Sequence, residues 1–270
     1  MKRIGYSSLA CSAVMTLALV GAAFATPVPN SAIISERIFN DCALSTLTST
    51  NLYPASISIN DVMHQACVGN ANLHSWSYSE DGGATPTLFV NGSNFTACAF
   101  VRIEGEGQGE GGLRFGPWWA PLVDGRFMIN ADAAHAPLGE VACFGGRLPF
   151  YSFTANHGVT YTKGTTVFMQ MTYTANGLSS VSPATIQYRY VDASGTYDSP
   201  ALPYDEGNPA ENPPHGLWGC LHDAMVGGYF QPKANTQASL TCTWEEICFT
   251  NNDVVPTVPS TWGRIKTLYR

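Results

Sequence analysis

The chain has 270 residues, a formal net charge of −7 at pH 7 and 12% charged residues. Globular proteins average about 25% charged residues, so the composition is typical of a weakly charged protein rich in small polar and aromatic side chains. The acidic balance argues against a nucleic-acid-binding protein, because neutralising a run of phosphates requires clustered Lys and Arg.

The first 25 residues have the pattern of a secretory signal peptide. Lys2 and Arg3 provide the positive start, an apolar run follows from 9 to 20, and Ala23-Phe24-Ala25 supplies the small-residue site after which signal peptidase cleaves. The apolar run is shorter than the ~20 residues that span a bilayer. We therefore expect a secreted, extracellular protein that does not span a membrane.

The rest of the chain is expected to form one domain over 26–252, followed by a tail over 253–270. Short segments rich in β-branched and aromatic residues recur there between Gly, Pro and Asn turns. They predict strands at 33–39, 56–62, 76–78, 87–90, 95–104, 113–119, 125–129, 141–144, 150–154, 166–174, 185–191, 216–222, 227–232 and 239–249. The segment 45–51 has the composition of a polar loop, and no segment has the period of an amphipathic helix. The pattern predicts an all-β sandwich or barrel.

The sequence contains eight cysteines, of which Cys11 lies in the expected signal peptide. In an oxidising compartment the others are disulfide candidates: Cys42, Cys67, Cys98, Cys143, Cys220, Cys242 and Cys248. An odd number leaves at least one thiol free or bonded to another chain. Cys42 could pair with Cys242 if the first and last strands are antiparallel neighbours, but the connectivity stays open. No C-x-x-C pair points to zinc.

Several motifs carry a resemblance to a known superfamily: GGLRFGPWW, VDGRF, ACFGGRLPFYSF, DEGNPAENPPHGLWG, VGGYFQ and LTCTWEEICF. Together they resemble exported bacterial proteins of the concanavalin A-like lectin/glucanase superfamily, in particular a group that shares P-W-W, V-D-G-R-F and G-N-P-A-E motifs. The resemblance covers roughly 33–249. It implies a jelly-roll β-sandwich of two antiparallel sheets, one of them concave.

That superfamily contains lectins, glucanases and polysaccharide lyases, so the resemblance indicates the fold more than the function. The catalytic E-x-D-x-E strand of the glucanases is absent. The R-x-E-x-R strand of alginate lyases is matched only by Arg102 and Glu104, because Glu106 occupies the position of the second Arg. No catalytic residue is therefore carried over.

Aromatic residues provide candidates for a sugar-binding platform, since sugar C–H faces stack on aromatic rings. Core packing is the alternative role for such residues. Trp118 and Trp119 are neighbours, so in a strand they face opposite sides and at most one faces a ligand. The full set of candidate ligand-binding residues on the concave sheet is Trp118, Trp119, Arg126, Arg147, Trp218, Asp223, Tyr229 and Gln231.

Carboxylates provide candidates for catalysis. In a strand, Glu104 and Glu106 would lie ~6.6–6.8 Å apart, close to the ~6.5–9.5 Å between the two carboxyls of inverting glycosidases. A solvated Gly-rich loop is the alternative. The candidate acids, if the protein is an enzyme, are Glu104, Glu106, Glu110, Glu140 and Asp223.

A Pro-containing loop offers oxygen ligands of the kind that Ca²⁺ prefers. The candidate metal ligands are Asp205, Glu206, Asn208 and Glu211. Their spacing is not that of an EF-hand, and a polar loop stiffened by proline is the alternative.

These observations favour a secreted protein that binds a glycan or polysaccharide on its concave sheet. A glycoside hydrolase or polysaccharide lyase is the enzyme alternative. The second alternative is an extracellular structural protein that self-associates through a free cysteine or the tail, where Trp262, Leu268 and Tyr269 are candidate anchors in an otherwise disordered end.

Overall fold

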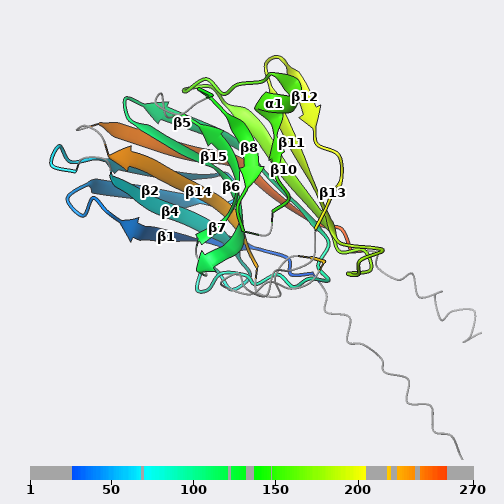
Figure 1. The fold of residues 1–270 in the computed structure, drawn as a ribbon. Helices are drawn as coiled ribbons and strands as arrows, with labels where there is room; N and C mark the ends of the chain where they lie inside the picture. Colours follow the sequence, from blue (N-terminus) through cyan, green and yellow to red (C-terminus); the bar gives the residue numbers. More distant parts are fainter. Residues whose placement is uncertain are drawn as a thin grey trace, which may run out of the picture.

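The computed structural model describes residues 26–67, 70–120, 123–131, 137–146, 148–204, 218–219, 224–234 and 238–253, and side chains are not described at 70, 117–120, 123–124 and 234. The expected signal peptide and the tail beyond Asp253 lie outside these residues. The described chain is a jelly-roll β-sandwich in which two antiparallel sheets pack face to face (Figure 1).

The two sheets use strands from all along the chain. The seven-stranded sheet has the order β1 (Ser31–Asn40), β4 (Asn70–Ser79), β14 (Met225–Ala234), β6 (Gln108–Ala120), β7 (Val123–Asn130), β8 (Val141–Phe144) and β9 (Tyr151–Ser152). The eight-stranded sheet has the order β12 (Gly195–Asp198), β11 (Thr185–Asp192), β10 (Val167–Thr174), β5 (Phe95–Gly105), β15 (Ser239–Asn251), β3 (Ser56–Val62) and β2 (Thr46–Leu52), with β13 (Leu202–Pro203) paired to β11.

The core lies between the inner faces of the two sheets. Strand alternation places Val167, Met169, Met171 and Tyr173 of β10 in it, and all four side chains are buried, as the period of two predicts. Each such side chain contributes about 1.5–3 kcal/mol through the removal of apolar surface from water. The clear alternation in the sequence therefore identifies a strand that contributes one whole face to the core.

Two indole rings cross the core from opposite sheets. The rings of Trp76 and Trp244 lie 6.2 Å apart and nearly perpendicular, an arrangement that aromatic pairs prefer. Trp244 donates from Nε1 to the carbonyl oxygen of Gly112 at 2.9 Å. Gly228 sits against both indoles, and a Cβ there would collide with their Nε1 atoms. Close packing against the two indoles therefore requires glycine at position 228.

Most predicted strands are present, but some local predictions are wrong. The segment 45–51, expected as a loop, contributes β2, which pairs with β3 along its whole length. It is an edge strand whose side chains are mostly exposed, so it lacks the alternating apolar signal of a half-buried strand. The predicted strand at 87–90 is reduced to a single bridge between Phe89 and Ala224.

The predicted strand at 150–154 ends early because a short helix, α1 (Phe153–His157), begins inside it. The Ser152 side chain accepts a hydrogen bond from the backbone N–H of Ala155, and Gly158 ends the helix in the left-handed conformation, with φ of 70°. No helix in the described part of the chain is long and apolar enough to cross a membrane.

Two disulfides connect four of the cysteines. Cys42 bonds to Cys67 and Cys98 bonds to Cys248, so the pairing of Cys42 with Cys242 is not formed. Cys242 and Cys143 are buried thiols, and burial raises the pKa of both well above the usual value. Neither is therefore a reactive thiolate. Cys220 lies outside the described residues.

Candidate functional site

The outer face of the seven-stranded sheet carries a cluster of polar and aromatic side chains. On β14, Val226 and Phe230 point into the core. Strand alternation therefore turns Tyr229 and Gln231 to the outer face. Pairing with β6 sets Gln231 opposite Glu110, and pairing of β6 with β7 brings Arg126 to the same face. We call Glu110, Arg126, Tyr229 and Gln231 the outer-face cluster.

The members of the cluster contact one another directly. Arg126 donates from Nη1 to the Glu110 carboxylate, and its guanidinium carbon lies 4.7 Å from the centre of the Tyr229 ring. The Tyr229 hydroxyl donates to Glu110 Oε1 at 3.4 Å. The side chains of Arg126 and Glu110 are 8% and 18% exposed. A charge-assisted bond and a cation–π contact at this degree of burial hold the three groups in a defined geometry.

Gln231 contributes an acceptor that has no hydrogen-bond partner among the described residues. Its Oε1 atom is buried and receives no hydrogen bond within the described part of the chain. A buried polar atom without a partner costs about 1–3 kcal/mol. A bound molecule with a hydroxyl that donates a hydrogen bond to this oxygen would offset that cost.

The same face holds polar residues that the sequence pattern did not indicate as candidates. Arg114 lies directly opposite Arg126 in the pairing of β6 with β7 and donates to the Ser77 hydroxyl at 2.7 Å. Ser75 Oγ is buried and has no hydrogen-bond partner among the described residues. The sequence does carry a signal for Arg114. It lies four positions after Glu110 on one strand, and residues an even number of positions apart share a face.

The other predicted acids are placed apart from the cluster. Glu104 lies on β5 of the eight-stranded sheet, where it pairs with Arg102 at 3.3 Å. Glu106 is exposed in the turn between β5 and β6, and Glu140 is half-buried just before β8. The chain crosses from one sheet to the other between Glu104 and Glu110, so these carboxylates are not brought together.

Most of the remaining candidates lie partly or wholly outside the described residues. Trp118 and Trp119 belong to β6, but their side chains lie outside the described part. Trp218 is described, and its carbonyl oxygen accepts from the backbone N–H of Ala184 at 2.7 Å, just before β11 of the other sheet. The remaining candidates lie outside the described residues: Arg147, Asp205, Glu206, Asn208, Glu211 and Asp223.

Within the described residues, no group of three or more His, Cys, Asp or Glu side chains could hold a metal ion. The candidate calcium loop is not among those residues, so calcium binding by that loop stays a prediction.

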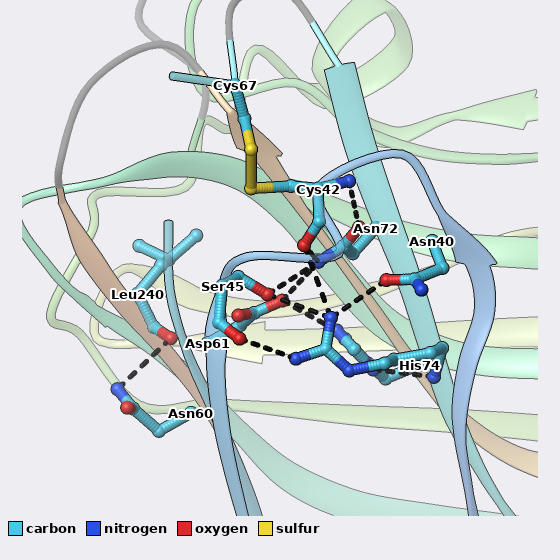
Figure 2. A network of polar contacts seen from close by, with 10 residues as sticks. Asn40, Cys42, Ser45, Asn60, Asp61, Cys67, Asn72, His74 and Leu240 are labelled. Atoms are coloured by element: carbon cyan, nitrogen blue, oxygen red, sulfur yellow. Dashed lines mark hydrogen bonds and ion pairs between the residues drawn. A yellow bond between two sulfur atoms is a disulfide. The ribbon is translucent and has the colours of Figure 1, made fainter. Parts of the chain in front are cut away.

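A second polar network lies between the sheets, close to the Cys42–Cys67 disulfide (Figure 2). Asp61 of β3 points inward beside Ile57 and Ile59, and it is fully buried. Its Oδ2 atom accepts from Asn72 Nδ2 at 2.7 Å and contacts His74 Nε2 at 3.0 Å. We call Asp61, Asn72 and His74 the inter-sheet network.

The surroundings determine which nitrogen of His74 carries the proton. The backbone N–H of Arg37 donates to His74 Nδ1 at 3.0 Å, so Nδ1 is the acceptor and Nε2 is the donor to Asp61. Burial alone would raise the pKa of Asp61, but hydrogen bonds from His74, Asn72 and Ser45 outweigh it and lower this pKa. Asp61 is therefore a buried carboxylate, and the network is a structural element of the fold.

No protein-family model and no curated protein sequence matches the chain. Among solved structures, it is similar to the lectin UEA-II complexed with galactose, with a TM-score of 0.46, 9% identity, and coverage of 85% of this chain and 97% of that chain. Lectin II from Ulex europaeus gives a TM-score of 0.43 at 10% identity over 85% and 97% of the two chains. A functionally unknown protein from Saccharomyces cerevisiae gives 0.39 at 9% identity over 78% and 97%.

Proposed function

We propose that this protein is a secreted carbohydrate-binding protein that recognises a glycan or polysaccharide on the outer face of its seven-stranded sheet. The outer-face cluster supplies the contacts. Gln231 Oε1 accepts hydrogen bonds from sugar hydroxyls. Arg126 and Glu110 form hydrogen bonds with other polar groups of the ligand, and the Tyr229 hydroxyl both donates and accepts. We include one of Trp118 and Trp119 in the proposed surface, because β6 continues through both from Glu110 and their side chains face opposite sides of the strand.

The observation that carries this proposal is the Gln231 oxygen, which has no hydrogen-bond partner within the described part of the chain and lies beside an ordered group of donors and acceptors. Ligand sites typically combine apolar lining with a few well-placed polar groups. Here Leu73, Met128 and Tyr229 form a buried apolar patch on the same face. Because Arg114 and Arg126 lie opposite each other, acidic polysaccharides are the first class to test, with neutral polysaccharides alongside.

The variant Gln231→Ala is expected to weaken polysaccharide retention about ten-fold, which corresponds to about 1.4 kcal/mol, the scale of one hydrogen bond. Its side-chain oxygen makes no bond within the described chain, so the substitution should not lower the free energy of unfolding by more than about 0.5 kcal/mol. Affinity electrophoresis in gels containing each polysaccharide measures the first quantity, and urea unfolding measures the second.

The matched control is Glu104→Gln, a polar change on the opposite sheet, which should leave retention unchanged. Trp118→Ala and Trp119→Ala are tested in the same gels. If the wild-type protein is retained by none of the polysaccharides, or if Gln231→Ala and Glu104→Gln weaken retention equally, the proposal fails.

A polysaccharide lyase is the second candidate, and the position of Tyr229 favours it over a hydrolase. A hydrolase requires two carboxyl groups at the site, whereas the outer-face cluster contains one, Glu110, which is paired with Arg126. Lyase chemistry instead requires a proton-abstracting group such as a tyrosine hydroxyl and a cation beside the substrate carboxylate. Ultraviolet absorbance of unsaturated products, measured on the same polysaccharides, tests this. If unsaturated products form with the wild type and disappear in Tyr229→Phe, a lyase activity replaces carbohydrate binding as the proposed function.

A further inference from the structure

The hydrogen bonds around Thr26 converge on one carboxylate. Thr26 is 2% exposed. Its backbone nitrogen donates to Asp253 Oδ2 at 2.7 Å, and its hydroxyl donates to Asp253 Oδ1 at 2.8 Å. The two residues are 227 positions apart, so these bonds join the two ends of the domain.

Two asparagines complete the surroundings of Thr26. The backbone N–H of Asn94 donates to the Thr26 hydroxyl oxygen at 2.9 Å, and Asn94 Nδ2 donates to Asp253 Oδ1 at 3.1 Å. Asn251 Nδ2 donates to the Thr26 carbonyl oxygen at 3.2 Å. Every polar group of Thr26 is therefore bonded to residues at the start of β5 or the end of β15. We call Asn94, Asn251 and Asp253 the Thr26 pocket.

The pocket has a negative charge that no ion pair balances within the described part of the chain. Burial would raise the pKa of Asp253, but hydrogen bonds from Thr26 and Asn94 lower it, so this group is a carboxylate. No Lys, Arg or His side chain among the described residues forms an ion pair with it. The atom that faces Asp253 Oδ2 is the nitrogen of the residue that directly follows the A-F-A cleavage motif.

We propose that cleavage after Ala25 converts Thr26 into an N-terminal α-ammonium that forms an ion pair with Asp253, so that removal of the leader completes the fold. Hydrolysis breaks the Ala25–Thr26 C–N bond. The hydroxyl of water goes to the Ala25 carbonyl carbon, a proton goes to the Thr26 nitrogen, and a second proton from solvent makes it an ammonium. A neutral amide donor is thereby replaced by a charged one, and charge-assisted hydrogen bonds are roughly twice as strong.

The test compares two chains exported from a bacterial host with the leader attached. One is the natural sequence, and the other carries Gly-Ser inserted after Ala25, so that its mature chain begins two residues before Thr26. Mass spectrometry establishes each N-terminus. We expect the natural chain to begin at Thr26, and the extended chain to have a Tm lower by about 3–6 °C at neutral pH.

The pH dependence gives an independent readout. An α-amino group has an ordinary pKa of about 7.7–8.0, and the neighbouring carboxylate should raise this pKa in the folded chain. The stabilisation is then complete below the ordinary value and is lost as the pH rises through the folded pKa. The Tm difference between the two chains should therefore disappear in alkaline buffer.

The variant Asp253→Asn in both chains separates this proposal from a neutral structural role for Asp253. The ion pair predicts that the Tm difference vanishes in the variant, whereas Asp198→Asn, which removes an exposed carboxylate on β12, leaves the difference intact. A mature N-terminus other than Thr26, equal Tm values for the natural and extended chains, or an unchanged difference in Asp253→Asn would each overturn it. None of these outcomes depends on carbohydrate binding, so the two proposals fail separately.

Discussion

Removing the Cys98–Cys248 disulfide is expected to lower the free energy of unfolding by about 5 kcal/mol. The bond joins residues 150 positions apart, and in the chain-entropy model the stabilisation grows with the length of the loop that is closed in the unfolded state. The two cysteines lie directly opposite each other on β5 and β15, so the folded strands position them without a long connection. Urea unfolding of the Cys98→Ala, Cys248→Ala double variant measures the loss.

The matched comparison is the Cys42→Ala, Cys67→Ala double variant, which opens a loop of 25 positions. The same model predicts a smaller loss of about 3.5 kcal/mol. The order of the two losses is the decisive result. If opening the shorter loop costs as much or more, the stabilisation by these bonds comes from native contacts such as the neighbouring inter-sheet network, and the chain-entropy account is wrong for this protein.

The variant Asp61→Ala is expected to destabilise the fold by about 3–5 kcal/mol. Asp61 is fully buried, and Asn72 and His74 both direct a donor at its carboxylate. Removing it leaves two buried donors without an acceptor, at about 1–3 kcal/mol each, in addition to the lost charge-assisted bonds. Asp198→Ala, which removes the partner of Arg189 in an exposed pair, should cost no more than about 1 kcal/mol.

The contribution of Asp61 should also depend on pH. Because its folded pKa lies below the ordinary Asp value of about 3.9, its stabilisation is complete above that value and is lost as the pH falls through the folded pKa. Asp198 and Asp253 also have lowered pKa values and are present in both proteins. The difference between the wild type and Asp61→Ala should therefore shrink in acid. A difference that is constant from pH 7 to acid would contradict a charged Asp61.

The sequence predicts a strand well where one face of that strand is buried, because burial of one face requires apolar and polar residues to alternate. This holds for β10 and β3, whose predicted ranges match the structure closely. It fails for β2, because an exposed edge strand has no face that must be apolar. It fails also at Phe153, because the cap at Ser152 is a local hydrogen bond that outweighs the aromatic strand propensity.

The sequence predicted several residues of the candidate site, but it did not predict which of them lie together. Arg126, Tyr229 and Gln231 were selected as residues of one sheet face, but Glu110 was grouped with Glu104 and Glu106. The grouping by sequence distance breaks down because β5 and β6 belong to opposite sheets. Conversely, β14 joins β6 although more than a hundred residues separate Tyr229 from Glu110. The physical reason is that sheet neighbours are set by long-range pairing.

By itself, then, the sequence determined the all-β class, the positions of most strands and the presence of structural disulfides, because each depends on local alternation, turn residues or composition. Only the tertiary structure decided which cysteines pair, that Asp61 lies in an inter-sheet network, and that Thr26 meets Asp253. Each of these contacts joins strands or strand ends that lie on different parts of the chain. The order of strands within a sheet, which brings such partners together, is chosen by the packing of the whole sandwich.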